Sequence, residues 1–294
     1  MYLNDPELII PVRKNQNHLK KLNANHPCMD EKAHNTIARL HLPVAPKCNI
    51  LCRYCERQVC PSNINDVFPG ISAVILSPSQ ALKKTGEFLK KWGRGSIVGI
   101  SGPGDPLANT ETFETMKYIR DKHPDVRLCL CTNGLALPEN FSNIISLGIR
   151  HLTVTVNAVD PSVGASVYKW ITRNGIRYQG IEGASILLDN QLNGIKSAVK
   201  NHIFVKINTV VIPGINDHHI SDVSALMANL GCFVHNIVPL IPRGELKNIK
   251  RPGPELMKAI RHESEPHMPV FSKCRQCRAD AEGIPGKEGC CDKN

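Results

Sequence analysis

The sequence has few aromatic residues, no long hydrophobic run and no signal-peptide pattern. Phe, Trp and Tyr make up 5% of the 294 residues, so the rows of stacking rings typical of single-strand nucleic-acid binding are not expected. No run approaches the roughly 18 apolar residues of a membrane span. The first residues, MYLNDPELIIPVRKNQ, lack the apolar region of a secretory signal. These absences favour a cytoplasmic protein that contacts neither membrane nor nucleic acid.

The formal net charge is +10, and two explanations of this excess stay open. A basic surface can bind nucleic acid, but here the basic residues are scattered rather than arranged in a stripe. Positive charge can also offset bound anions, such as iron–sulfur clusters with thiolate ligands. The charge alone does not decide between them.

Cysteines are too sparse for a disulfide scaffold, but they are grouped. The chain has 12 of them, and small disulfide-stapled domains have a much larger share. The groups lie at positions 48, 52, 55 and 60, at 129 and 131, at 274 and 277, and at 290 and 291. In a reducing compartment such groups favour metal binding over disulfides.

The hydrophobic pattern predicts an α/β fold from about residue 40 onward. Strand-like and helix-like segments alternate, which is typical of βαβ units and a parallel sheet. The expected strands cover residues 38–46, 96–102, 126–134, 150–158, 202–214 and 235–242, and the expected helices 77–93, 110–123, 138–148, 181–201, 217–231 and 253–263. The helix from residue 110 has Asn109 or Thr110 as its expected N-cap.

Six such units predict a partial (β/α)6 TIM-like barrel. We expect the barrel over residues 38–245, an N-terminal extension over 1–37 and a C-terminal extension over 246–294. Chemistry in such folds lies at the carboxyl ends of the strands. Four polar or cysteine-containing segments follow expected strands: the stretch with Cys48, Cys52 and Cys55, SGPGDP (101–106), Thr132 to Gly134, and Asn157. Their convergence predicts a functional site at this end of the barrel.

The stretch APKCNILCRYC, residues 45–55, has the spacing CxxxCxxC at Cys48, Cys52 and Cys55. Three thiolates can hold three irons of a 4Fe–4S cluster and leave the fourth iron open to a small ligand. With Tyr54 before the last cysteine, the motif resembles that of the radical S-adenosylmethionine (SAM) superfamily. The resemblance implies that the open iron binds SAM. A zinc knuckle or a structural group of reduced thiols is the alternative.

The same resemblance implies further SAM contacts at the strand ends. GISGPGDP resembles the glycine-rich motif that receives the amino group of SAM, which points to Gly102, Gly104 and Asp105. Asn157 and Asn208 are candidates for the ribose or carboxylate, and Val238, with Pro239, for the adenine. The alternatives are a turn-capping role for Asp105 and ordinary buried amides for the two asparagines.

Other motifs resemble those of the NifB family of nitrogenase cofactor maturases. They are NHPCMDEKAHNTIARLHLPVAPKCNILCRYC, GPGDPLAN, LCLCTNGLALP and CRQCRADAEGIPG, and the resemblance runs from about residue 26 to 286. The family fuses two 4Fe–4S clusters with a carbide derived from the SAM methyl group and an added sulfide. The chain looks like the short form without a C-terminal carrier domain.

The family resemblance implies two substrate clusters. The first would take Cys28, His41 and Cys129 as ligands, and the second Cys274 and Cys277. A neutral imidazole such as His41 can ligate iron and, once displaced, accept a proton. A hydrogen-bonded structural histidine is the alternative.

Two further cysteine groups leave alternatives open. Cys129 and Cys131 lie two apart on an expected strand, so both point to the same side of the sheet. We expect Cys129 to be the ligand and Cys131, where the family often has serine, to be a small apolar filler. The CRQC pair would need Cys290 and Cys291 to form a zinc site. Cys60 is a candidate transient ligand, and Cys232 is expected in the core.

The sequence therefore predicts an oxygen-sensitive radical SAM enzyme that uses SAM, one resident 4Fe–4S cluster and two substrate clusters. The expected partners are iron–sulfur cluster donors, scaffold or carrier proteins for the product, and a reductant such as ferredoxin or flavodoxin. Two other functions stay open: another radical SAM enzyme with auxiliary clusters, or a non-enzymatic iron–sulfur carrier.

Overall fold

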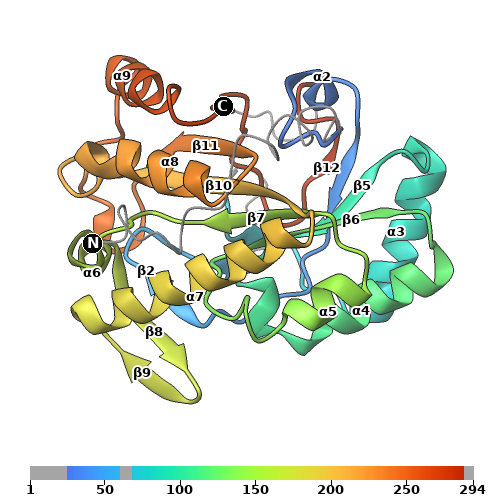
Figure 1. Cartoon of the computed structure of the whole chain (residues 1–294). Helices are drawn as coiled ribbons and strands as arrows, with labels where there is room; N and C mark the ends of the chain where they lie inside the picture. Colours follow the sequence, from blue (N-terminus) through green and yellow to red (C-terminus); the bar gives the residue numbers. More distant parts are fainter. Residues whose placement is uncertain (1–24, 60–67, 288–294) are drawn as a thin grey trace.

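A curled sheet forms the centre of the computed structural model, which describes residues 25–59 and 68–287 (Figure 1). Within these residues six parallel strands and one antiparallel edge strand form the sheet. In spatial order they are β11 (Val234–Pro239), β10 (Phe204–Val211), β7 (His151–Thr155), β6 (Arg127–Thr132), β5 (Ile97–Ile100), β1 (Arg39–His41) and β12 (Glu282–Gly283). The six parallel strands lie side by side in chain order, which confirms the predicted partial barrel.

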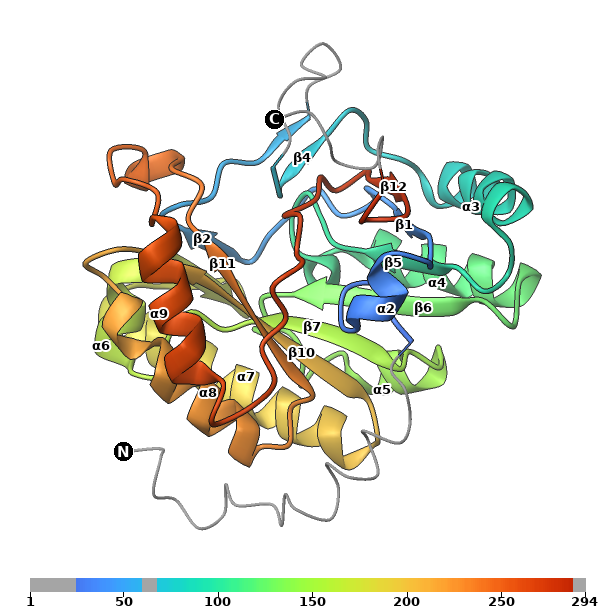
Figure 2. The ribbon, with the colours of Figure 1, turned by 90° about the horizontal axis from the view of Figure 1, so that it is seen from above.

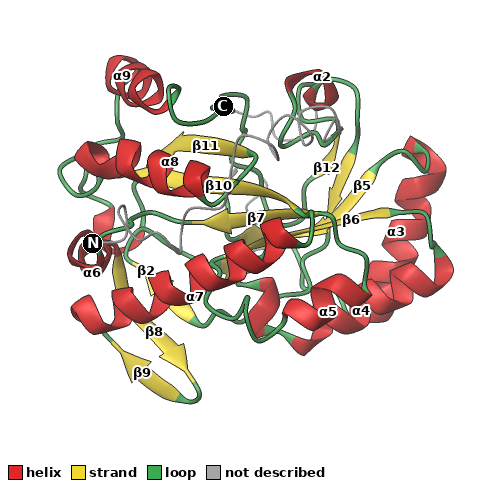
Figure 3. Ribbon diagram, in the orientation of Figure 1, coloured by secondary structure: helices red, strands yellow, loops and turns green. Residues whose placement is uncertain are grey.

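Helices cover the outer face of this sheet (Figure 3). They are α3 (Pro78–Trp92), α4 (Thr110–Lys122), α5 (Phe141–Ser146), α7 (Gly180–Lys200) and α8 (Ile220–Asn229), with α9 (Pro254–Ser264) after the last parallel strand. The start of α3 is fixed by a capping box between Ser77 and Gln80, with Pro78 at the first position. Each parallel strand before α9 is followed by at least one helix, as the hydrophobic pattern predicted.

The strands alternate between an apolar outer face and a cavity-facing inner face. Strand β6 shows this most clearly, because Leu128 and Leu130 are buried in the core beneath the helices. Cys129 and Cys131 point to the opposite face and line the central cavity. This side-chain alternation, intrinsic to a strand, confirms that the two cysteines share one side.

The C-terminal segment crosses from one edge of the sheet to the other (Figure 2). It leaves α9 and meets β11, where the amide of His235 donates to Pro269 O at 2.9 Å and that of Phe271 donates to His235 O at 2.8 Å. It then reaches β1, where β12 pairs antiparallel with Arg39 and Leu40. We call residues 269–283 the strap, because they join the two edges that the open barrel leaves apart.

A smaller sheet was not predicted from the sequence. It consists of β2 (Ile50–Cys52), β8 (Tyr168–Arg173) and β9 (Ile176–Tyr178), and α6 (Pro161–Val167) precedes it. Two short strands, β3 (Gln58–Val59) and β4 (Ile71–Ser72), and a short helix, α2 (Glu31–His34), complete the strands and α-helices of the described residues. Strand β2 pairs with β8 through Ile50 and Leu51. The insertion between β7 and α7 thus supports the three-cysteine loop.

Asn109 is the N-cap residue of α4, as expected, but its side chain makes no capping hydrogen bond. Its amide nitrogen instead donates to Lys47 O at 2.9 Å, and its amide oxygen accepts from Lys47 N at 3.1 Å. The side chain therefore fixes the backbone immediately before Cys48. The N-terminal extension predicted over residues 1–37 lies mostly outside the described residues, and the proposed division into three parts stays a prediction.

Candidate active site

A cavity of about 310 Å³ lies inside the curled sheet and contains most of the predicted ligands. Its lining includes His41 and seven of the cysteines chosen from the sequence: Cys28, Cys48, Cys52, Cys55, Cys129, Cys274 and Cys277. These residues come from positions as far apart as 28 and 277. The fold therefore brings the separate motifs of the sequence to one place.

The loop with Cys48, Cys52 and Cys55 closes one end of the cavity. The amide of Cys55 donates to Cys52 O at 3.0 Å, which makes a tight turn between the last two thiols. The phenol of Tyr54 accepts from the amide of Asn157 at 2.9 Å and ties this turn to the end of β7. Burial raises the pKa of Cys48 to about 12. These thiols therefore need a metal to become thiolates at neutral pH.

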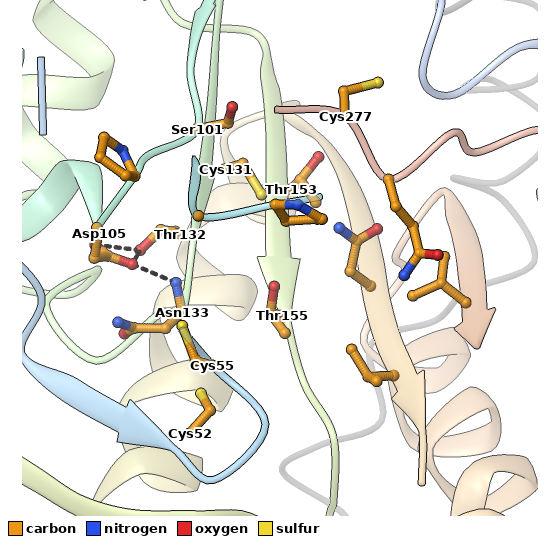
Figure 4. A pocket seen from close by; sticks show the side chains of 18 of the residues that line it. Cys52, Cys55, Ser101, Asp105, Cys131, Thr132, Asn133, Thr153, Thr155 and Cys277 are labelled. Atoms are coloured by element: carbon orange, nitrogen blue, oxygen red, sulfur yellow. Dashed lines mark hydrogen bonds between the residues drawn. The ribbon is translucent and has the colours of Figure 1, made fainter. Parts of the chain in front are cut away.

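A buried carboxylate organises the neighbouring strand ends (Figure 4). Asp105 is 3% exposed and accepts hydrogen bonds from Thr132 Oγ1 at 2.9 Å and from Asn133 N at 2.6 Å. It also accepts from Leu107 N at 2.9 Å, which caps a short turn. Burial raises the pKa of this carboxyl to about 6. Asp105 thus joins the ends of β5 and β6.

Gly104 is required by close packing between two backbones. A Cβ at this position would overlap Lys47 O. The Gly104 amide donates to Ala45 O at 2.6 Å, and the Asp105 amide donates to Lys47 O at 2.9 Å. The glycine-rich motif thereby holds the segment that leads into Cys48.

Further inside the barrel, His41 and Cys129 lie in one row across the sheet. His41 pairs with Gly99, Gly99 with Cys129, and Cys129 with His151. Directly paired residues share a face of the sheet, so the row points into the cavity. A Cβ on Gly99 would overlap the Cys129 Sγ atom. The missing side chain at Gly99 therefore makes room for the Cys129 thiol on the side of the sheet that His41 shares.

The geometry of His41 suits a metal ligand. Its Nδ1 lies 3.1 Å from Arg278 O, a group that can only accept a hydrogen bond, so Nδ1 carries the proton and Nε2 keeps its lone pair. Burial lowers the pKa of His41 to about 3. The imidazole is therefore neutral at physiological pH, which favours ligation over proton acceptance.

Cys28 reaches the same row from the segment before α2. Its amide donates to His26 Nδ1 at 3.1 Å, and the His26 ring lies against His151 with 4.8 Å between ring centroids. Because His151 is the register partner of Cys129, this contact places Cys28 beside the His41–Cys129 row. Burial raises the pKa of the Cys28 thiol.

The strap brings Cys274 and Cys277 to the wall of the cavity. Figure 4 shows Cys277 on the side of the cavity away from Cys52 and Cys55. The buried guanidinium of Arg39 donates to Cys277 Sγ at 2.6 Å and to Gly283 O at 3.2 Å. Gln276 Nε2 donates to Pro239 O at 3.0 Å at the other edge of the sheet. These bonds position the CRQC turn between β1 and β11.

None of these cysteine groups forms a compact single-ion site. Among residues 25–59 and 68–287 no three His, Cys, Asp or Glu side chains converge as ligands of one metal ion. Cluster ligands bind different irons of one cubane and so stand further apart than the ligands of one ion. Cys290 and Cys291, which the zinc alternative needs, lie outside the described residues.

Comparisons with known proteins agree with this geometry. The family model "Radical SAM superfamily" matches residues 42–227. The "FeMo cofactor biosynthesis protein NifB" of Klebsiella pneumoniae is 43% identical over 272 residues, which cover 90% of this chain and 58% of that protein. The protein of the same name from Methanocaldococcus jannaschii is 41% identical over 259 residues, covering 88% and 86%. The chain belongs to the NifB family of radical SAM proteins.

The lengths of NifB proteins differ around this shared part. The chain spans 58% of the Klebsiella protein but 86% of the Methanocaldococcus protein. Among solved structures, methylornithine synthase (PylB) superposes with a TM-score of 0.54 at 14% identity, covering 88% of this chain and 68% of that chain. That likeness concerns the fold alone, and with the family match it agrees with the predicted partial barrel.

The predicted SAM contacts of this NifB-family chain fall into two groups. Gly104, Asp105, Asn208 and Val238 line the cavity. Asn157 takes a different position from the one expected, because it is fully buried and does not line the cavity. Its oxygen accepts from Val210 N at 2.9 Å while its nitrogen holds Tyr54, so it reaches the site only through the Tyr54 turn.

Gly102 is also absent from the cavity lining. It faces the strap instead, because a Cβ built on it would contact Ala279. Cys131 lines the cavity and is labelled in its middle in Figure 4. Cys232 is 2% exposed and packs in the main core, as expected. Cys60 lies outside the described residues.

Sequence reasoning missed two buried cations of this site. Arg39 and Lys206 are 1% and 4% exposed, and both lie on strands whose other residues are mostly apolar or small. A charged residue inside such a strand was the available signal, because Arg and Lys are seldom fully buried without a partner. The described helices include none with the length and apolar character of a membrane span.

Proposed function

We propose that this chain is a cytoplasmic enzyme that joins two 4Fe–4S substrate clusters into one larger cluster of a nitrogenase cofactor. In this reaction the SAM methyl group supplies a central carbide, and one sulfide is added. The observation that carries the proposal is that the candidate ligands of all three clusters line one cavity. A shared cavity holds the reacting groups near one another, which removes much of the entropic cost of their encounter.

The Cys48, Cys52 and Cys55 thiols would hold the resident 4Fe–4S cluster, and SAM would complete its coordination. When bound, this group supplies hydrogen-atom abstraction after one-electron cleavage of SAM. The chain contributes ligation, orientation and exclusion of water. Gly104, Asn208 and the apolar Val238 offer backbone, amide and alkyl contacts to SAM from the cavity wall. Asp105 sets the position of the strand ends that carry these contacts.

The two substrate clusters would occupy the rest of the cavity. Cys28, His41 and Cys129 would hold the first cluster. Cys274 and Cys277 on the strap would hold the second. Because the strap bonds to both sheet edges, the second cluster is held opposite the Cys48 loop and against the first. His41 would accept a proton from the methyl carbon only after its imidazole leaves iron, because the Nε2 lone pair is engaged while it binds the metal.

The expected partners follow from this chemistry. A low-potential reductant such as ferredoxin or flavodoxin would supply electrons, iron–sulfur cluster donors would load the sites, and a scaffold or carrier protein would receive the product. Such clusters are oxygen-sensitive, so the enzyme would act in an anaerobic or oxygen-protected cytoplasm.

The test uses the anaerobically reconstituted chain, dithionite and SAM labelled with 13C in the methyl group. We expect release of both S-adenosylhomocysteine and 5′-deoxyadenosine, and 13C coupling to iron in the electron–nuclear resonance spectrum. The Cys52→Ala variant is the control and should show no 5′-deoxyadenosine. 5′-Deoxyadenosine without 13C in the cluster would favour another radical SAM reaction. No cleavage at all would favour an iron–sulfur carrier.

A further inference from the structure

A buried lysine lies in the middle of the cavity. Lys206 on β10 is 4% exposed and lines the cavity together with Asn208, two residues further along the same strand. Its register partner on β7 is Thr153, and Thr153 in turn pairs with Cys131 on β6. Cys131 and Thr153 are labelled between the Cys52–Cys55 end and the Cys277 end in Figure 4. Lys206 therefore stands one level above the Cys129 row, toward the Cys48 loop.

The ammonium group of Lys206 has no counter-charge within the described residues. It takes part in no ion pair or hydrogen bond there. Of the residues that line the cavity, the two carboxylates are engaged elsewhere. Asp105 accepts from Thr132 and Asn133, and Glu56 accepts from Gln58 Nε2 at 3.1 Å. No carboxylate of the cavity lining engages the Lys206 ammonium, so a small anion in the cavity would meet an available positive charge there.

The surroundings of Lys206 identify the chemistry of that anion. Cys131 and Thr153 lie in its own row across the sheet, and Cys28 and Cys129 line the same cavity. The adjacent Thr153 hydroxyl offers one further hydrogen bond. A small anion at this point would lie beside iron that is bound by thiolates. Such iron favours soft sulfur ligands, so the anion that fits best is a sulfide.

We propose that Lys206 is an anion-binding residue that holds a sulfide between the Cys48 loop and the Cys129 row. The role of this site depends on the proposed function, because the sulfide would be held where the two clusters are joined. Two sources share this chemistry: a bridging sulfide of a substrate cluster, or free hydrosulfide that becomes the added sulfur. Lys206 is a positioning residue in the first case and binds a substrate in the second.

The first arm of the test uses the metal-free full-length chain under anaerobic conditions. Lys206→Met removes the charge and keeps the length of the side chain, Lys206→Arg keeps the charge, and Lys258→Met on exposed α9 is the matched control. Calorimetric titration with sodium hydrosulfide should show that Lys206→Met binds the anion at least about tenfold more weakly than the wild-type chain. Binding by Lys258→Met should be unchanged.

The second arm measures the midpoint potentials of the reconstituted clusters. If the partner is a cluster sulfide, Lys206→Met should shift one substrate-cluster potential to a more negative value, because a nearby cation favours the reduced form. A change in hydrosulfide binding alone identifies free hydrosulfide, and a change in potential alone identifies the cluster sulfide.

The proposal is overturned if Lys206→Met changes neither hydrosulfide binding nor any potential relative to Lys258→Met. Folding failure of Lys206→Met does not obscure this outcome, because Lys206→Arg must retain at least one of the two properties. Failure of the proposed function is separate. It appears as normal cluster potentials and hydrosulfide binding in the wild-type chain without 13C incorporation.

Discussion

The two sets of cavity cysteines differ in how the chain assembles them. Cys48 precedes β2, Cys52 ends it and Cys55 lies in the turn after it, so local backbone structure brings the three together. The other ligands come from four separate places: the segment before α2, β1, β6 and the strap. The local set depends on one loop and its support, whereas the dispersed set depends on the register of the whole sheet. The two sets should therefore fail independently.

The largest expected effect comes from a substitution in the Cys48 loop, which should disable the local set and leave the dispersed set intact. Cys52→Ser should abolish SAM cleavage, because the loop then lacks one of three cluster ligands. The dispersed sites should still fill, so iron should fall by only about four per chain. Iron analysis and 5′-deoxyadenosine release after reconstitution measure both effects. Loss of all iron would mean that the dispersed set depends on the loop.

The converse test displaces the Cys129 thiol from its place over Gly99. Gly99→Ala places a methyl group against Cys129 Sγ, which should block the first substrate cluster and cost about 1–3 kcal/mol of stability through overpacking. SAM cleavage should persist, since the loop is untouched. Gly95→Ala is the matched control, because a Cβ there meets nothing within 4 Å. Equal iron content in the two variants would refute the assigned row.

A smaller effect tests what holds the loop. Tyr54→Phe removes the phenol oxygen that accepts from Asn157 and leaves a buried amide donor unpaired, which costs about 1–3 kcal/mol. Iron should be lost faster from the Cys48 loop than from the dispersed sites. Mössbauer or EPR spectra during chelator treatment distinguish the two. Faster loss of iron from the dispersed sites would contradict this, because it would mean that Tyr54 supports those sites rather than the Cys48 loop.

The smallest effect concerns His41 in the metal-free chain. Its folded pKa of about 3 lies below the ordinary value of 6.5, so the unfolded state takes up a proton first as the pH falls. Stability should therefore decline from about pH 7 downward, by roughly 1 kcal/mol at pH 6 and more toward pH 3. Urea unfolding should show a smaller decline for His41→Gln, while exposed His262→Gln keeps the wild-type slope.

Much of the fold could be predicted from the sequence because strands and helices carry their own periodicity. The six parallel strands and their helices, and the shared side of Cys129 and Cys131, follow from such local patterns. The β8–β9 hairpin and the strap pairing of β12 with β1 could not be predicted. Arg39 and Gly283 are register partners across 244 residues, and no local pattern encodes such a pairing.

The same limit applies to the site. The spacing of Cys48, Cys52 and Cys55 could be read directly, whereas the room that Gly99 makes for the Cys129 thiol appears only once three strands are in register. Asn157 follows the end of β7 as expected, yet its buried amide serves Tyr54 rather than the cavity. Lys206 was visible as a lysine within an apolar strand, but its missing counter-charge is a property of the assembled cavity.

The most direct test of the account counts iron and acid-labile sulfide per chain after anaerobic reconstitution. The account predicts about twelve irons and twelve sulfides, which correspond to one resident and two substrate 4Fe–4S clusters. In Gly99→Ala this number should fall to about eight. About four irons in the wild-type chain would contradict the account, because the Cys48 loop would then be the sole cluster site.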